Sequence, residues 1–201
     1  MEKTAKAVSY LFHPLIIPSL GMLVLYNSGT YLSYLPPDLK RWILLIVFLL
    51  TYLVPLAFIP FFMYQRMVMN LEMESKRERY IPLAVSLLLY GICYFIVRRI
   101  PIPHPYHTFL LSTVLAMTAT LLITLVYRIS FHMVGAGGLV ALVGFLAFHM
   151  KVDLQFYLGT AVVLAGITGT ARIILKAHTQ DEIYVGFLIG FSVVLLSMLL
   201  I

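Results

Sequence analysis

One short stretch near the C-terminus carries side chains suited to phosphate chemistry. Arg172 and Lys176 are cations that could hold an anion. His178 is an imidazole able to attack phosphorus, and Glu182 lies four residues on, where a carboxylate could orient that imidazole. The stretch lies between two apolar runs that are each long enough to cross a bilayer. Charge at such a place is costly, so we expect these residues to have a function.

The composition predicts the elements that must position this stretch. The chain has 201 residues, of which 62% are hydrophobic and only 11% charged, so we expect a single integral membrane domain over 1–201. The net charge of +6 comes without a long basic run, which favours lipid headgroups or anionic ligands as partners and excludes nucleic acid. The single cysteine, Cys93, excludes an intrachain disulfide.

The apolar runs predict an all-α, polytopic transmembrane helix bundle of about seven spans (six to seven) in the cell (inner) membrane. The expected spans cover 8–26, 41–64, 81–97, 108–127, the run after His132, 154–170 and 183–201. The first run is too long for a signal peptide, and we expect His13 to be a packing residue beside a proline kink. Pro55 and Pro60 predict kinks in the second span. Residues 27–40 have the turn signals of a short exposed connection.

Seven spans place alternate connections on the same side of the membrane. The segments 65–80, 128–132 and 171–182 therefore share one face, at the boundary where a lipid's phosphate lies. The ionisable and hydroxyl residues brought to this face are Lys76, Arg77, Arg79, Arg128, Ser130, His132, Arg172, Lys176, His178 and Glu182. More cations fall on this face than on the other, but those that would bind phosphate must be discounted, so the orientation stays open.

These residues resemble the motifs of the type 2 phosphatidic acid phosphatase superfamily, which includes acid phosphatases and haloperoxidases. The spacing of the third motif is reproduced in full by Arg172, His178 and Glu182, and Ser130 and His132 reproduce the second in part. The first motif is recognisable only as Lys76, Arg77, Arg79 and Pro82, without its spacing.

The chain also departs from the family pattern. Ala171 stands where the third motif has serine, and Glu182 stands where it has aspartate. Ile129 and Phe131 replace the proline and glycine that flank the serine of the second motif, which alters the backbone expected to bend over a phosphate.

The resemblance implies that the helix bundle is similar to the phosphatidic acid phosphatase core. It also implies hydrolysis of a lipid or polyprenyl phosphate or diphosphate, with no metal or other cofactor. His178 would form a phosphohistidine, Glu182 would hold its other ring nitrogen, and His132 would serve as acid and then base. The residues implied to bind the phosphate oxygens are Arg172, Arg79, Lys76, Arg77, Ser130 and Arg128.

The same residues allow other interpretations. Thr179 to Glu182 reads as a capping box, in which the carboxylate would return to the Thr179 amide and not reach His178. His132 could be a hydrogen-bonded interior histidine, and Arg172 and Lys176 could reach out to the headgroups from the membrane boundary. A relative that binds a lipid phosphate without turning it over is a further alternative.

A different class of function would use the opposite face. His104, His107, His149 and Asp153 gather there and could be imagined as a metal site of a transporter or enzyme. Prolines separate the first pair, and anchoring at the headgroup level is the competing interpretation.

Overall fold

The computed structural model describes residues 1–66, 76–151 and 153–201, which form an all-helical bundle. Its elements are α1 (Glu2–Leu11), η1 (Pro14–Ile16), α2 (Ile17–Tyr26), η2 (Tyr31–Tyr34), α3 (Pro37–Phe48), η3 (Leu49–Leu53), α4 (Val54–Tyr64), α5 (Lys76–Val97), α6 (His104–Val126), α7 (Phe131–His149), α8 (Gln155–Ile174) and α9 (Gln180–Leu200). Within these described ranges, seven helical stretches are long and apolar enough to cross a membrane, as the sequence predicted.

Proline interrupts the first two of these stretches. The span Glu2–Tyr26 is broken into α1 and α2 by the 3-10 turn η1, which begins at Pro14. The span Pro37–Tyr64 contains the π-helical turn η3, which directly precedes the start of α4 at Val54 and Pro55. Because Pro55 lacks an N–H and its ring crowds the carbonyl four residues earlier, a widened turn at this point accommodates it.

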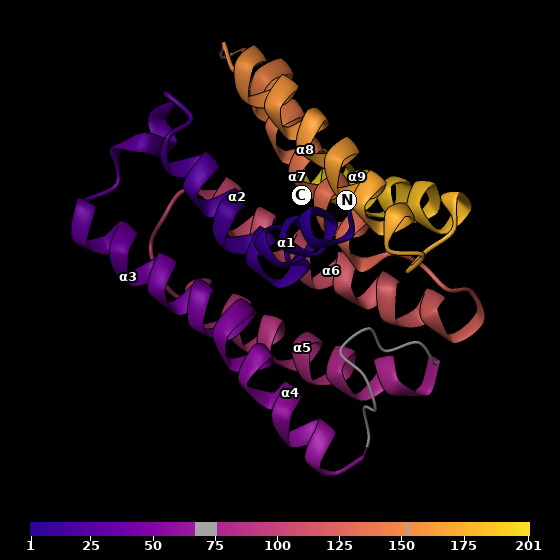
Figure 1. The fold of residues 1–201 in the computed structure, drawn as a ribbon. Helices are drawn as coiled ribbons and strands as arrows, with labels where there is room; N and C mark the ends of the chain where they lie inside the picture. The colour runs from indigo at the N-terminus through magenta and orange to yellow at the C-terminus, as the bar shows by residue number, and fades with distance from the viewer. Residues whose placement is uncertain (67–75, 152) are drawn as a thin grey trace.

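The helices are arranged with α1, α2 and α6 in the middle of the view of Figure 1. On one side of them α3, α4 and α5 run together, and on the other side lie α7, α8 and α9. Helices α7 and α9 touch through their backbones: a Cβ atom added at Gly190 would overlap the carbonyl oxygen of Val134, and one at Gly137 would overlap that of Phe187. This close approach is the one expected of small residues between membrane helices.

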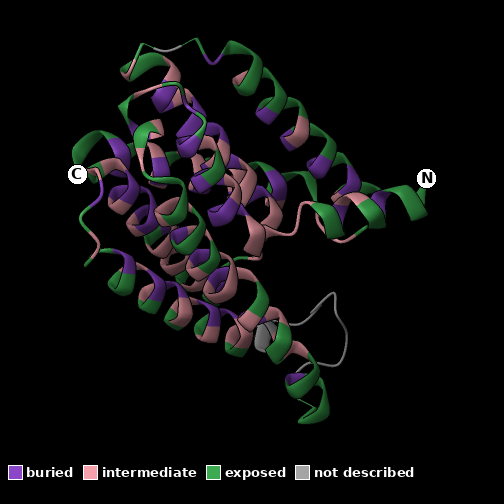
Figure 2. Cartoon of the chain, turned by 90° about the vertical axis from the view of Figure 1, so that its left-hand side faces the viewer, coloured by how far each residue is buried: buried purple, intermediate pink, exposed green. Residues whose placement is uncertain are grey.

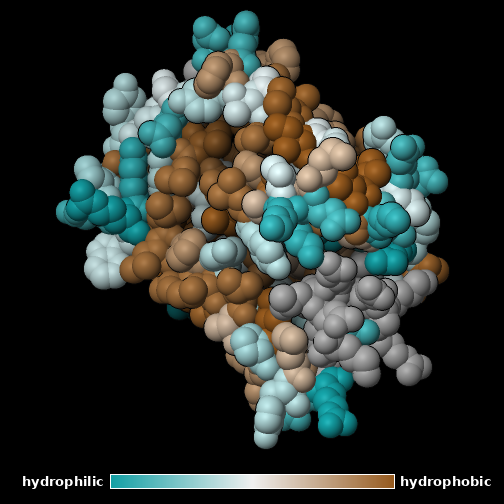
Figure 3. All heavy atoms as spheres, viewed as in Figure 1, coloured by the Kyte–Doolittle hydropathy of each residue, from teal (hydrophilic) through white to brown (hydrophobic). Residues whose placement is uncertain are grey.

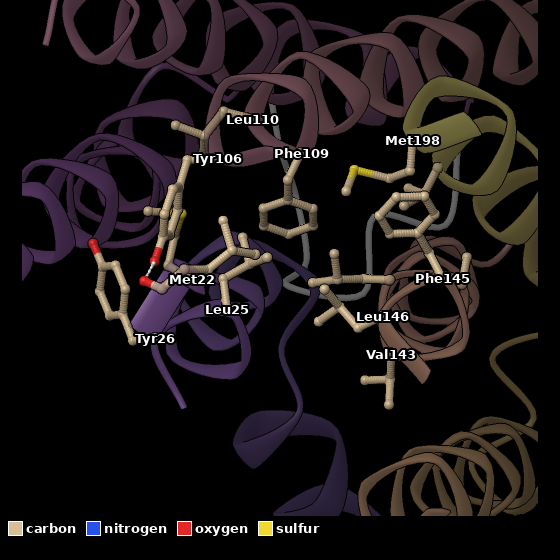
Figure 4. Packing of buried hydrophobic residues seen from close by; sticks show 14 of the residues in the cluster. Met22, Leu25, Tyr26, Tyr106, Phe109, Leu110, Val143, Phe145, Leu146 and Met198 are labelled. Carbon is tan, nitrogen blue, oxygen red and sulfur yellow. Dashed lines mark hydrogen bonds between the residues drawn. The ribbon is translucent and has the colours of Figure 1, made fainter. Parts of the chain in front are cut away.

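A packed apolar cluster fills the end of the bundle at which α6 begins (Figure 4). Tyr106, Phe109 and Leu146 are fully buried there, and the Tyr106 hydroxyl donates to the carbonyl of Leu32 at 2.6 Å. Leu32 belongs to the segment 27–40, which the sequence predicted to be an exposed connection. That prediction was wrong for Leu32, because the 3-10 turn η2 folds this side chain back into the core.

The outer surface is largely apolar. Buried positions face the interior of the bundle while its outward faces are exposed (Figure 2), and many of those exposed side chains are large and hydrophobic, such as Leu88 and Leu188. One face of the molecule carries broad hydrophobic areas with hydrophilic residues gathered mainly at its margins (Figure 3). Apolar outward faces on helices of this length are those of an integral, multi-pass membrane protein.

Candidate functional site

A cavity of about 650 Å³ opens at the end of the bundle where α7 and α9 begin. Its polar part is lined by Lys6, Ser9, His13, His132, Arg172 and His178. Its remaining wall is mostly apolar and is built by α2, α4, α5, α6, α7 and α9. The cavity thus joins a cationic, imidazole-rich end to an apolar interior, which is the form of a site for an amphiphilic anion.

His178 and Glu182 form the closest polar contact of the site. The Nδ1 atom of His178 lies 2.6 Å from Oε2 of Glu182, and the side chains are only 4% and 12% exposed. The same carboxylate oxygen accepts from the backbone N–H of Thr179 at 3.3 Å, while the Thr179 hydroxyl accepts from the Glu182 N–H at 3.4 Å. The capping box and the histidine contact, which we had treated as alternatives, therefore coexist.

The turn between α8 and α9 holds His178 in place. The N–H of Lys176 donates to the carbonyl of Ile173 and that of Ala177 to the carbonyl of Arg172, which is the Schellman pattern that closes a helix. Lys176 occupies the left-handed position of this turn, with φ 52°, and its side chain is exposed. Arg128 donates to the Ala177 carbonyl at 3.2 Å and so joins this turn to the segment before α7. Neither Lys176 nor Arg128 lines the cavity.

Ser130 is placed differently from what the second motif implied. Its backbone N–H donates to the carbonyl of Glu182 at 3.2 Å, so the two motif segments do meet. Its side chain, however, is completely buried where the start of α7 packs on Gly186, and it is not part of the cavity wall. The Ser130 backbone is held against Gly186 of α9, and its hydroxyl is buried without a hydrogen-bond partner among the described residues.

His132 and Arg172 both contact Ser9 of α1. The Nε2 atom of His132 lies 3.1 Å from the Ser9 carbonyl oxygen, and Nη1 of Arg172 donates to the Ser9 hydroxyl at 3.4 Å. Because a carbonyl oxygen only accepts, Nε2 of His132 carries the proton, and Nδ1 is the acceptor in the neutral ring. The imidazole of His132 also interacts electrostatically with Arg172, His178 and His13.

His13 and Ser9 were missed as site residues. The ring of His13 meets that of His132 edge-on, with 5.8 Å between the ring centroids, and both rings line the cavity. The expectation that His13 only packs beside a proline was therefore incomplete. The available signal was a histidine inside an apolar span, which in a membrane indicates function more often than it does in a soluble core.

Two further groups of residues were predicted as site residues from the sequence. The side chains of Lys76, Arg77 and Arg79 lie outside the described residues, although their backbone opens α5. On the opposite face, His107 bonds the Ile102 carbonyl, His104 bonds Thr108, and His149 stacks on Phe145. Within the described ranges no three His, Cys, Asp or Glu side chains gather closely enough to hold a metal ion, so the proposed grouping at that face does not form.

The cavity wall thus combines the guanidinium of Arg172 with the imidazoles of His178 and His132. Acid–base and nucleophilic chemistry on a phosphoryl group needs these parts. No protein-family model, no curated protein and no solved structure matched the chain.

Proposed function

We propose that the protein is a phosphatase of the cell membrane that hydrolyses a lipid or polyprenyl phosphate or diphosphate through a phosphohistidine. The observation that carries the proposal is the 2.6 Å contact between His178 and Glu182 on the wall of a cavity that also contains Arg172 and His132. A carboxylate on Nδ1 fixes the ring so that Nε2 holds the lone pair, and it stabilises the positive charge that develops when Nε2 attacks.

In the first step Nε2 of His178 attacks phosphorus. A nitrogen–phosphorus bond forms while the bond from phosphorus to the leaving oxygen breaks. Nδ1 of His132 takes a proton from the substrate's phosphate monoanion and passes it to that oxygen, because the Nε2–H of His132 is directed to the Ser9 carbonyl. The Arg172 guanidinium neutralises charge on the phosphoryl oxygens. Lys76, Arg77 and Arg79 stay predicted phosphate ligands in this scheme.

In the second step a water molecule attacks phosphorus. His132, again neutral, accepts a proton from that water, and the nitrogen–phosphorus bond breaks. Inorganic phosphate takes this proton from His132 and leaves, so His178 returns to its starting tautomer and His132 to its neutral form. The cycle is balanced in protons and needs neither a metal nor a redox partner.

A second candidate function is binding of a lipid phosphate without turnover. Two observations favour it: the Ser130 hydroxyl lies outside the cavity, and Nε2 of His132 is already engaged by the Ser9 carbonyl. Binding and turnover separate cleanly in experiment. A non-catalytic protein would bind the phosphate and release none.

Phosphate release from a panel of lipid and polyprenyl phosphates tests the proposal. We expect purified protein to release phosphate, His178→Ala to lower the rate by at least about 10³-fold and His132→Ala by about 10²-fold or more. His104→Ala is the matched control, since His104 is an exposed histidine at the other end of the bundle. Equal rates for the unaltered protein and both site variants would exclude the enzyme assignment, and a chemically trapped phosphohistidine at residue 178 would support it directly.

A further inference from the structure

His13 lies where the first membrane span is interrupted, between α1 and α2. Its ring is packed between two others, with centroids 5.8 Å from His132 and 6.2 Å from Tyr52. It lines the same cavity as Arg172 and His178, and Arg172 is near enough to interact with it electrostatically. A polar ring at this depth costs free energy unless its polar atoms are used.

The backbone determines which nitrogen of His13 carries the proton. The N–H of Leu15 donates to Nδ1 of His13 at 3.4 Å, as part of the cap of the 3-10 turn η1. Nδ1 is therefore the acceptor, and in the neutral ring Nε2 bears the hydrogen. His13 thus offers the cavity a hydrogen-bond donor without needing a positive charge.

The three histidines of the cavity consequently differ in what they can do. His178 has its Nδ1 on a carboxylate, and in the proposed mechanism its Nε2 is the atom that attacks phosphorus. His132 directs Nε2–H to a carbonyl, which leaves Nδ1 to exchange a proton. His13 has its acceptor nitrogen occupied by the backbone and keeps only a donor. Of the three, only His13 is arranged to bind an oxyanion without taking part in proton or phosphoryl transfer.

We infer that His13 is a phosphate-binding residue of this site, donating from Nε2 to a phosphoryl oxygen that Arg172 also holds. The inference rests on the proposed function, because both place a phosphate in the same cavity. It adds a residue from the first span to a site whose motif residues all come from the later part of the chain. The phosphate can belong to a lipid or be free, since the donor recognises the group they share.

Two substitutions separate the binding role of His13 from its capping role. In His13→Asn the side-chain oxygen takes the place of Nδ1, so the cap on the Leu15 N–H is kept and the donor at the Nε2 position is lost. In His13→Gln the amide nitrogen reaches the Nε2 position, so the donor is kept and the cap is lost. A binding role and a purely structural role therefore predict opposite orders for the two variants.

Calorimetric titration of the purified, detergent-solubilised protein tests this, with inorganic phosphate in one arm and micelles containing phosphatidic acid in the other. We expect His13→Asn to bind phosphate about 10-fold or more weakly while its melting temperature is unchanged, since hydrogen bonds to charged groups are strong. His13→Gln should bind more tightly than His13→Asn and melt earlier. Weakening in one arm alone identifies which source of phosphate the site takes.

A failure of the His13 assignment can be distinguished from a failure of the proposed function. Full phosphate affinity in His13→Asn would overturn the assignment of His13 and leave the proposed function standing. An unaltered protein that binds neither probe would overturn both.

A measurement on the unaltered protein guards against variants that do not fold. Phosphate should slow modification of His13 by diethyl pyrocarbonate, measured by mass spectrometry, and should leave modification of the exposed His104 unaffected. Equal modification of His13 with and without phosphate would also overturn its assignment.

Discussion

The end of the bundle where α6 begins is filled by side chains, whereas the end where α7 and α9 begin holds a cavity of about 650 Å³. At the filled end Tyr106, Leu110 and Leu146 are completely or almost completely buried, and the Tyr106 hydroxyl has a carbonyl partner. At the hollow end three histidines, a guanidinium and a lysine line the cavity, together with hydroxyl side chains such as that of Ser9.

This difference indicates that the two ends of the bundle contribute to different properties, one to stability and the other to activity. Between membrane helices, stability comes from close packing, because lipid tails are as apolar as the side chains they would replace. The filled end has such packing. The hollow end lacks it, because the cavity leaves space beside charged and polar groups. We therefore expect substitutions at the filled end to change stability and those at the hollow end to change activity.

Substitutions of Glu182 should have the largest effect on activity at the hollow end, because its carboxylate contacts both His178 and the helix cap. Glu182→Gln keeps an acceptor for the Thr179 amide but removes the charge beside His178. We expect phosphate release to fall by roughly 10³- to 10⁴-fold, as for other carboxylates that orient a catalytic imidazole, with little change in melting temperature. Glu182→Ala should lose activity similarly and also lose about 1 kcal/mol of stability. Equal activity in Glu182→Gln and the unaltered protein would mean that the carboxylate serves only the cap.

Leu146→Ala should lower stability and leave activity unchanged, the reverse of Glu182→Gln. Leu146 is fully buried in the packed cluster, so its truncation removes contacts and leaves a void. We expect a loss of about 2–5 kcal/mol in the free energy of unfolding, measured by denaturation in detergent. Activity per folded molecule should be unchanged. Leu188→Ala is the matched control, because Leu188 is exposed on the outer face of α9 and its truncation should change stability little.

Lys176→Gly should have the smallest effect. Lys176 holds the left-handed position of the turn before His178, where a side chain costs roughly 1 kcal/mol relative to glycine. We expect a slightly higher melting temperature and an activity within about twofold of the unaltered protein, because the Lys176 side chain does not line the cavity. A large loss of activity would instead assign the ammonium group to phosphate binding.

The sequence was sufficient to predict the seven spans and the meeting of the segments around His132 and His178, because span length and alternation determine which connections share a face. It could not predict that Ser130 is buried outside the cavity wall, since that depends on how closely the backbone before α7 approaches Gly186. Nor did any motif mark His13, whose place in the site depends on how the first span breaks. The resemblance to the phosphatase superfamily remains a prediction.

The backbone contact between α7 and α9 has a consequence for how a lipid would reach the cavity. His132 and His178 lie at the starts of these two helices, and the helices cannot separate without breaking the contact at Gly137 and Gly190. We therefore expect this part of the wall to keep its spacing when the entrance widens. Labels that report movement belong on α1, α4 and α5, with α7 and α9 as the reference.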